Sequence, residues 1–303
     1  GRRRQYGMSE GVCKKMATPT KKYLQETHAS AAELASAWRA VCSTLRITLA
    51  GRALGDALFP SMAINDRFAA ATLQAIGDDG TRWVTDRHSM WGVLARTRFF
   101  RDQAQSFMRA HPDAHFVNIG CGLSQYFQWL DNGQTRMTDA DLLEVVAVRE
   151  QLLPPLNARH RVLAVDVTRP DWWEQLQLPH GGEQPLFLMM EGVSMYLDAD
   201  QMRSVLRVVG EQAPEDSFMV LDAFCMAATG NAIWHPSLRQ AGASLRWGLK
   251  RLSEFREAHE RLHLVQTHDI MAGYGVPNAL VSMGFTLLTG VPFYAAYVLR
   301  VAE

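Results

Sequence analysis

Four short segments in the middle of the chain each end in a glycine turn or an acidic residue. They cover residues 116–122, 138–141, 165–167 and 190–192, at intervals of roughly 17 to 25 residues. This spacing is typical of successive parallel strands that deliver side chains to one edge of a doubly wound sheet. We therefore expect an α/β fold with a ligand site at that edge.

The first of these segments ends in the turn 120–122, with the sequence Gly-Cys-Gly. Glycine has no Cβ and tolerates positive φ, so this turn lets the backbone approach a ligand closely. Acids such as Asp141 and Asp166, at the ends of the next two strands, are placed to accept hydrogen bonds from ribose hydroxyls and an adenine amine. A nicotinamide dinucleotide favours a third glycine under its pyrophosphate, but Gln125 occupies that position. The pattern favours an adenosyl ligand without a pyrophosphate.

Composition limits the class of protein. The 303 residues are 48% hydrophobic and 20% charged, and 31 basic residues balance 31 acidic ones. Such a chain can bury a large core but has no overall field to attract nucleic acid or an anionic membrane. No apolar run approaches a membrane span and no secretory signal is present, so we expect a cytoplasmic protein. The four cysteines lack Cys-x-x-Cys spacing, which predicts neither a metal site nor a disulfide framework.

The chain divides into three expected regions. Residues 1–28 are basic and predict a flexible leader. Residues 29–110 have apolar residues at helical spacing and predict a helical N-terminal cap. Residues 111–303 predict the ligand-binding sheet domain, with a helical insertion at about 225–270 after the fifth strand. Its end predicts a helix, a turn at Gly284-Phe285 and a terminal strand over 294–301, forming the closing antiparallel hairpin that is typical of methyltransferase sheets.

Five ordered motifs, at residues 95–97, 118–122, 139–145, 164–167 and 190–197, resemble those of the leucine carboxyl methyltransferase family. The branch most similar is that of bacterial and fungal O-methyltransferases of polyketide and other secondary metabolism, and the likeness extends from about Thr44 to the C-terminus. It implies the class I methyltransferase Rossmann-like fold, with a mostly parallel seven-stranded sheet. It also implies S-adenosylmethionine as cofactor, S-adenosylhomocysteine as product, and a small-molecule acceptor.

The same resemblance assigns roles to individual residues. Arg96 matches the arginine that pairs with the cofactor's carboxylate, a role suited to a bidentate guanidinium. Asp141 matches the ribose ligand, and Glu191 the acid beside the cofactor's amino group. The alternative for Asp139 or Asp141 is a helix cap, and we favour Asp141 as the ligand. The complete set of expected cofactor contacts is Arg96, Asn118, Gly120, Cys121, Gly122, Asp139, Asp141, Asp166, Val167, Glu191 and Gly192.

Two departures from the family pattern bear on function. Members that methylate a protein C-terminus carry a cofactor-contacting lysine ahead of the arginine motif, whereas this chain has no lysine between Lys22 and Lys250. The missing lysine argues against protein carboxyl methylation, which we keep as an alternative. A protein that binds the cofactor without transferring its methyl group is a second alternative. A proline common two residues after the ribose aspartate is Leu143 here, which alters only a helix start.

The acceptor oxygen decides whether a general base is needed. A carboxylate is ionised at neutral pH, whereas a phenol, with a reference pKa of about 10, benefits from a base. Candidate bases are His235, His263 and His268, and Tyr196 is a further candidate in the loop after the fourth strand. An apolar acceptor pocket is expected from Tyr196, Phe224, Met226, Trp234 and Trp247, although an ordinary apolar core is the alternative for the same residues.

Overall fold

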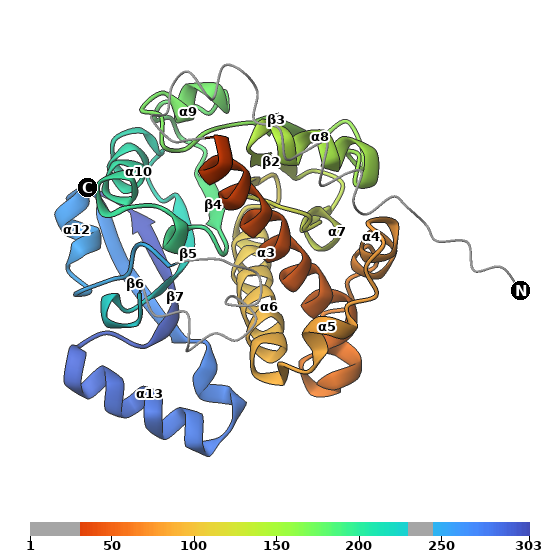
Figure 1. The fold of residues 1–303 in the computed structure, drawn as a ribbon. Helices are drawn as coiled ribbons and strands as arrows, with labels where there is room; N and C mark the ends of the chain where they lie inside the picture. The colour runs from red at the N-terminus through yellow and green to blue at the C-terminus, as the bar shows by residue number, and fades with distance from the viewer. Residues whose placement is uncertain (1–30, 230–244) are drawn as a thin grey trace, which may run out of the picture. The chain divides into compact units, whose positions relative to one another are not determined.

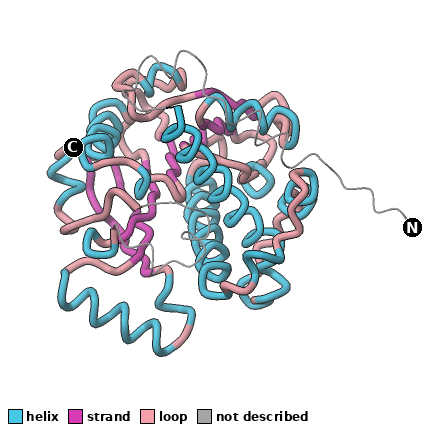
Figure 2. The backbone as a smooth tube through the Cα atoms, viewed as in Figure 1, coloured by secondary structure: helices cyan, strands magenta, loops and turns pink. Residues whose placement is uncertain are grey.

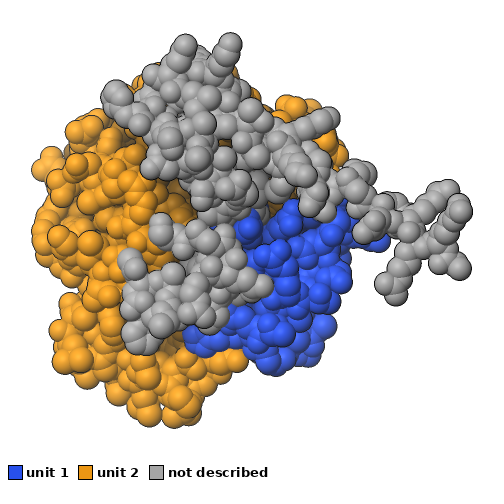
Figure 3. Space-filling model, viewed as in Figure 1, with its two compact units in different colours: residues 1–94, 232–244 blue, residues 95–231, 245–303 orange. Residues whose placement is uncertain are grey.

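The computed structural model describes residues 31–229 and 245–303, and side chains from residue 43 onward. The chain forms two compact units, which Figure 3 distinguishes by colour. Of the described residues, 31–94 belong to the first unit and 95–229 with 245–303 to the second. No helix in this described part of the chain is long and apolar enough to cross a membrane.

The first unit is helical, as predicted for this part of the chain. Its elements are α3 (Ala31–Leu58), η1 (Pro60–Met62), α4 (Ala69–Ala75), α5 (Thr81–Val84) and the start of α6 (Arg87–Ala110). A Cβ on Gly51 of α3 would lie 2.6 Å from Cγ1 of Val93, so the glycine lets α3 and α6 approach closely. Asp66 accepts hydrogen bonds from the backbone N–H groups of Phe68 and Ala69 and so begins α4, as expected for a helix cap.

The second unit contains a seven-stranded sheet in the order β3-β2-β1-β4-β5-β7-β6. Strands β1 to β5 are parallel, and β7 runs antiparallel to both β5 and β6. Figures 1 and 2 show these strands side by side. The expected doubly wound sheet with antiparallel C-terminal strands is confirmed. The strands are β1 (His115–Ile119), β2 (Arg136–Asp141), β3 (His160–Ala164), β4 (Leu186–Met190), β5 (Phe218–Phe224), β6 (Leu262–Asp269) and β7 (Tyr294–Val301).

Helices cover both faces of this sheet. On one face α9, α10 and α12 pack with the strands in a single apolar cluster. On the other face, Phe107 of α6 packs its ring against Phe116, Phe187 and Phe218. The helical elements of this unit after α6 are α7 (Phe127–Leu130), α8 (Leu143–Leu152), α9 (Trp172–Gln175), η2 (Ser194–Tyr196), α10 (Ala199–Gln212), η3 (Met226–Ala228), α12 (Glu254–Ala258), η5 (Met271–Tyr274) and α13 (Val276–Thr289).

Local sequence explains several of these boundaries. All five residues of β4 are buried, as expected for the continuous apolar run at its position between parallel strands. The capping box of Asp198 and Gln201 begins α10, because each side chain accepts from the other residue's backbone N–H. Helix α8 ends just before Pro154-Pro155, since proline cannot continue a helix.

Two expectations about the last third of the chain are wrong. The helical insertion predicted for 225–270 is interrupted by β6, whose side chains are mostly exposed or half-buried because it is an edge strand with a single neighbour. Its weak apolar alternation therefore hid it in the sequence. The turn predicted at Gly284-Phe285 lies inside α13, which instead ends at Gly290 in the left-handed conformation.

Candidate functional site

The turn after β1 brings the backbone to the carboxyl edge of the sheet. Gly120 has a φ of +73°, and its N–H donates to the carbonyl of Ala140 at 2.8 Å, next to the N–H of Cys121 at 3.0 Å. A Cβ on Gly120 would collide with Cγ2 of Val193 in the loop after β4. Only glycine satisfies both the conformation and the space, so this position is fixed by backbone geometry.

Asp141 ties this turn to the end of β2. Its Oδ2 accepts from the N–H of Gly122 at 2.8 Å, and its Oδ1 from the N–H of Leu142 at 2.7 Å. Burial raises the pKa of this carboxyl, although the two backbone hydrogen bonds and the charge of Arg149 oppose the shift. The carboxylate is half-buried and held in one orientation, with lone pairs left for a further donor.

Asp139 has a different environment from Asp141. It is fully buried, and its Oδ2 contacts Nη2 of Arg149 at 3.0 Å and Nε2 of His160 at 2.7 Å. Arg149 also donates to the carbonyl of Gly122 at 3.0 Å. Asp139 therefore lies buried next to two predicted ligands, and burial and the charge of Asp139 raise the pKa of both Asp141 and Cys121. Asp139 holds the guanidinium of Arg149, and Arg149 in turn holds the backbone of the glycine turn at Gly122.

Asp166 follows β3 at the same edge. Its Oδ1 accepts from the N–H and the hydroxyl of Thr168, at 3.0 and 2.6 Å, which closes a local turn. Both Asp166 and Val167 are half-buried, so their side chains remain accessible at the edge where the turn 120–122 lies.

Arg96 of α6 lies at the centre of a buried polar cluster. Its Nε donates to Oε1 of Glu191 at 3.1 Å, and its Nη1 to Oδ2 of Asp222 at 3.3 Å and to the hydroxyl of Tyr294 at 2.9 Å. Burial lowers the pKa of this guanidinium, but its interactions with Tyr294, Asp222 and Glu191 outweigh burial and raise the pKa well above its ordinary value. Arg96 is therefore a permanent cation.

The carboxylates around Arg96 have further donors. Glu191 accepts from the hydroxyl of Thr97 at 3.2 Å and from the hydroxyl of Tyr126. Asp222 is fully buried and accepts from the N–H of Gly192 at 2.7 Å, and burial raises its pKa. One guanidinium faces two carboxyl groups, so with both ionised the cluster has an excess of one negative charge. This excess favours a cationic ligand.

Three members of this cluster were not found from the sequence. Asp222 follows the first four residues of β5, which are apolar. The search for an acid after an apolar strand, which found Asp141, Asp166 and Glu191, would have found Asp222 if it had included the fifth strand. Tyr126 and Tyr294 gave no signal, because a tyrosine in a helical or strand pattern is indistinguishable from an ordinary core aromatic. Their hydroxyl contacts are decided by tertiary packing alone.

Several polar atoms at this edge retain hydrogen-bonding capacity. Nη2 of Arg96 makes no hydrogen bond within the described residues, and a Cβ on Gly192 would lie 3.2 Å from it. Oδ1 of Asn118 and the side-chain amide of Gln125 are buried without partners in the described part of the chain. Buried polar atoms are normally paired, so these groups indicate a place for a polar ligand.

The residues predicted to line an acceptor pocket differ in burial and in what they contact. Phe224 stacks on Tyr294 with ring centroids 4.4 Å apart, directly beside the Arg96 cluster. Trp247 is only 5% exposed and belongs to the apolar core, which favours the core alternative for this residue. Met226 is exposed and Tyr196 half-buried in η2, whereas Trp234 and His235 lie outside the described residues.

The two described candidate histidines lie at opposite ends of β6. His268 is near the carboxyl edge of the parallel strands, since it pairs with Ala296, two residues along β7 from Tyr294, and its ring stacks on Phe99 at 4.3 Å. Burial lowers its pKa. His263 is at the other end, with its Nε2 3.0 Å from the carbonyl of Ala302. Among the described residues, His, Cys, Asp and Glu form no group of three or more that could hold a metal ion.

The family model described as leucine carboxyl methyltransferase matches residues 29–210, which is more than half of the chain. The chain belongs to the leucine carboxyl methyltransferase family. The resemblance predicted from the five motifs is thereby confirmed, and the protein is an S-adenosylmethionine-dependent methyltransferase.

Relatives and solved structures agree with this membership. The chain is 30% identical to the tetracenomycin polyketide synthesis O-methyltransferase TcmP of Streptomyces glaucescens, over 69% of this chain and 75% of TcmP. It is 25% identical to the S-adenosyl-L-methionine-dependent methyltransferase dpfgK of Gibberella zeae, over 77% and 85% of the two chains. The fold resembles that of a candidate methyltransferase from Thermobifida fusca, with a TM-score of 0.53, 14% identity, and coverage of 77% of this chain and 93% of that one. A DUF574 family protein from Streptomyces avermitilis gives a TM-score of 0.52, at 13% identity and coverage of 78% and 89%.

The residues of this methyltransferase fit S-adenosylmethionine. Gly120, at positive φ, brings the backbone to this edge, and Nη2 of Arg96, which makes no hydrogen bond within the described residues, matches a carboxylate. The excess negative charge around Arg96 matches the ammonium and sulfonium of the cofactor. When bound there, the cofactor supplies an activated methyl group.

Proposed function

We propose that this methyltransferase methylates an oxygen atom of a small aromatic or polyketide-type molecule, either a carboxylate or a phenol. One observation carries the proposal. Tyr294 accepts a hydrogen bond from Arg96 with its hydroxyl and stacks its ring on Phe224, so an aromatic surface lies directly beside the acidic Arg96 cluster. The name of TcmP, a polyketide O-methyltransferase 30% identical to this chain, supports the same acceptor class.

We assign the cofactor's polar groups to particular side chains. Nη2 of Arg96 binds the carboxylate of the methionine part, and Glu191 accepts from its ammonium. Asp141, oriented by two backbone N–H groups, accepts from the ribose hydroxyls. Asp166 accepts from the adenine amine with the oxygen that Thr168 does not use. Asp139 supports the glycine turn through Arg149, which with His160 occupies its Oδ2, while its Oδ1 has no partner within the described residues.

The remaining requirement is an acceptor oxygen held in line with the methyl group and away from water. An ionised carboxylate needs no base. For a phenol, we assign His268 as the base, since its lowered pKa keeps the imidazole neutral at pH 7 and able to take a proton. His263 shares the strand but lies at its other end and serves as a matched control.

Calorimetric titration with S-adenosylhomocysteine tests the cofactor assignment. We expect Asp141→Asn to weaken binding about 10- to 100-fold, because hydrogen bonds to a charged carboxylate are lost. Asp171→Asn, an exposed carboxylate in an ion pair with Arg169, should bind like the wild type, and NAD should not bind. Unchanged binding in Asp141→Asn would contradict the ribose assignment.

A panel of aromatic carboxylates and phenols, with methyl transfer followed by mass spectrometry, tests the acceptor. For a phenol substrate we expect His268→Gln to lower kcat about 100-fold, while His263→Gln has little effect. For a carboxylate substrate both variants should retain activity. Transfer to nitrogen acceptors only, or to a protein C-terminus only, would contradict the proposal.

A further inference from the structure

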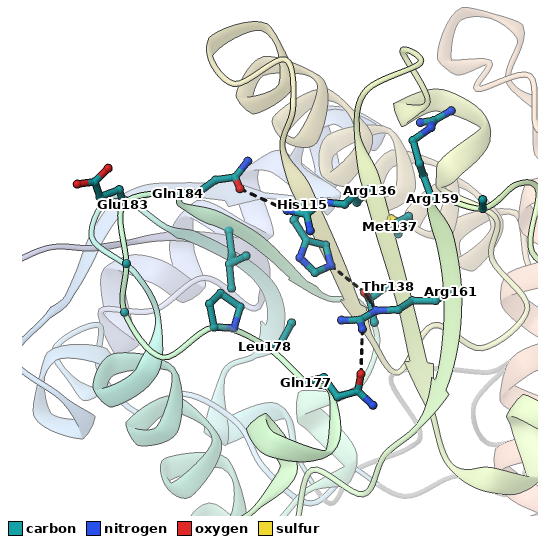
Figure 4. A pocket seen from close by; sticks show the side chains of 15 residues that line it. His115, Arg136, Met137, Thr138, Arg159, Arg161, Gln177, Leu178, Glu183 and Gln184 are labelled. Carbon is teal, nitrogen blue, oxygen red and sulfur yellow. Dashed lines mark hydrogen bonds between the residues drawn. The ribbon is translucent and has the colours of Figure 1, made fainter.

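A second cavity of about 560 Å³ lies at the amino ends of the strands, at the edge opposite the cofactor site. Residues from the starts of β1, β2, β3 and β4 line it, together with the loop that follows α9 (Figure 4). Strands of about five residues span roughly 15 Å, so this cavity is separated from the cofactor site by the length of the sheet. Its volume is within the usual range for small-molecule pockets.

Four polar side chains of this cavity share one face of the sheet. His115 on β1 lies opposite Arg136 on β2, and Thr138 on β2 lies opposite Arg161 on β3. Arg136 and Thr138 are two residues apart, so all four side chains point to the same side. Figure 4 shows them gathered in the cavity. The strand register alone therefore brings two guanidinium groups and an imidazole together.

The positive charge in this cavity has no acidic counterpart. Within residues 31–229 and 245–303, neither Arg136 nor Arg161 forms an ion pair, and their side-chain partners are the neutral groups of Gln184, Thr138 and Gln177. The third lining arginine, Arg159, is paired with Asp131 at 2.7 Å. Of the lining residues only Glu183 is acidic; it is exposed, and Figure 4 shows it on the far side from Arg161.

The two unpaired arginines influence one another and the histidine. Burial lowers the pKa of Arg161, and the charge of Arg136 lowers it further. Burial, followed by the charges of Arg136 and Arg161, lowers the pKa of His115 to about 3. His115 is thus neutral, and its Nε2 lies 2.8 Å from the hydroxyl of Thr138. Because that hydroxyl accepts from Nε of Arg161, its own proton is available to Nε2, which leaves Nδ1–H of His115 as a further donor.

We propose that this cavity binds a small phosphorylated molecule, whose phosphate oxygens accept from Arg136 and Arg161. Planar guanidinium groups match phosphate oxygens geometrically, and a phosphate relieves the repulsion between the two cations. The cavity is larger than a free phosphate requires. Leu178, Pro179 and Leu186 form an apolar wall beside the arginines, which suits the organic part of a phosphomonoester.

Calorimetric titration of the full chain tests this site, with inorganic phosphate, pyrophosphate and AMP as separate probes at matched ionic strength. S-adenosylhomocysteine is present at saturation, so that an adenosyl site cannot take up AMP. We expect one saturable site, with pyrophosphate or AMP bound more tightly than phosphate. Tighter binding of AMP than of pyrophosphate identifies an organic phosphomonoester as the ligand class, and the reverse order identifies a free polyphosphate.

Variants locate the binding. Arg136→Gln changes an exposed side chain with one weak partner, so its fold is expected to persist. We expect Arg136→Gln and Arg161→Gln each to weaken binding about tenfold or more, and the exposed Arg207→Gln of α10 to leave it within about twofold. No saturable binding of any probe, or equal binding by wild type and Arg136→Gln, would overturn the proposal.

Discussion

The carboxyl and amino edges of the sheet differ in the sign of their local net charge. At the carboxyl edge, Arg96 is surrounded by Glu191 and Asp222, and three neutral hydroxyls complete the cluster. At the amino edge, Arg136 and Arg161 lie on the same face of β2 and β3, and their hydrogen-bond partners are all neutral. One edge has an excess of acid and the other an excess of base, within the same parallel strands.

This contrast teaches that charge balance, rather than the number of charged residues, distinguishes a ligand site from a structural ion pair. The Arg149–Asp139 pair is fully buried and balanced, and Arg149 also donates to the backbone carbonyl of Gly122. Both edges are unbalanced, and each therefore favours a ligand of the missing sign. The predictions below test whether each imbalance is a property of the folded protein.

The largest effect is expected from Arg96→Ala. The substitution leaves Glu191 and the fully buried Asp222 without their cation, so the free energy of unfolding should fall by about 3–5 kcal/mol. Binding of S-adenosylhomocysteine should be lost. Urea denaturation measures the first and calorimetry the second. Arg207→Ala, which breaks an exposed ion pair with Glu211, should change stability by less than about 1 kcal/mol. Equal stability of the two variants would contradict the prediction, because it would show that the buried ion pairs of Arg96 stabilise the fold no more than the exposed pair of Arg207.

Gly120→Ala separates backbone strain from close approach at the carboxyl edge. Gly120 and Gly133 both have positive φ, but only Gly120 would place a Cβ against Val193, while Gly133 has open space. We expect Gly133→Ala to cost about 1 kcal/mol and Gly120→Ala about 3 kcal/mol in unfolding free energy. Thermal denaturation of both variants measures the difference. If both lose the same stability, the close contact with Val193 is unimportant.

The amino edge predicts a pH dependence through His115. In the unfolded chain its pKa is about 6.5 and in the folded protein about 3, so below pH 6.5 the unfolded state binds more protons. Stability therefore falls as pH decreases, by about 2 kcal/mol between pH 6.5 and pH 5 from this group alone. In His115→Gln this contribution is absent, so the fall in unfolding free energy between pH 6.5 and pH 5 should be about 2 kcal/mol smaller than in the wild type. The same pH dependence in the variant would show that burial and the neighbouring arginines do not lower the pKa of His115 in the folded protein.

The smallest effect is expected from removing a single hydroxyl. Tyr294→Phe deletes the bonds to Arg96 and Asp222 and should lower stability by about 1–2 kcal/mol. Tyr297→Phe, on the same strand, removes a buried hydroxyl without a partner in the described residues, and should be neutral or stabilising. Differential scanning calorimetry compares the two. A greater loss of stability in Tyr297→Phe than in Tyr294→Phe would contradict the expectation that the hydrogen bonds of Tyr294 to Arg96 and Asp222 stabilise the fold.

Much of the sheet could be predicted from sequence, and the exception is instructive. Strands β1, β2 and β4 are mostly buried and lie between neighbours, and the edge strand β3 is half-buried; a glycine or an acid ends or follows each of the four, so their pattern is strong. Strand β6 is an edge strand with exposed side chains, and its sequence resembles a loop or helix. Both β3 and β6 have a single neighbour, but β6 has three consecutive exposed side chains, and the prediction failed there because no apolar pattern marks the strand.

The sequence by itself determined the order of the motifs, the family and the cofactor, because glycine turns and strand-end acids are local features with fixed chemical meaning. The tertiary structure decided which of two neighbouring acids is accessible: Asp139 and Asp141 have the same side chain and lie two residues apart, but only Asp139 is enclosed by Arg149 and His160. It also brought Tyr126, Asp222 and Tyr294 into one cluster, and placed Arg136 and Arg161 on the same face of the neighbouring strands β2 and β3. These contacts join residues far apart in the chain, and a charge is balanced or unbalanced only by what folding places beside it.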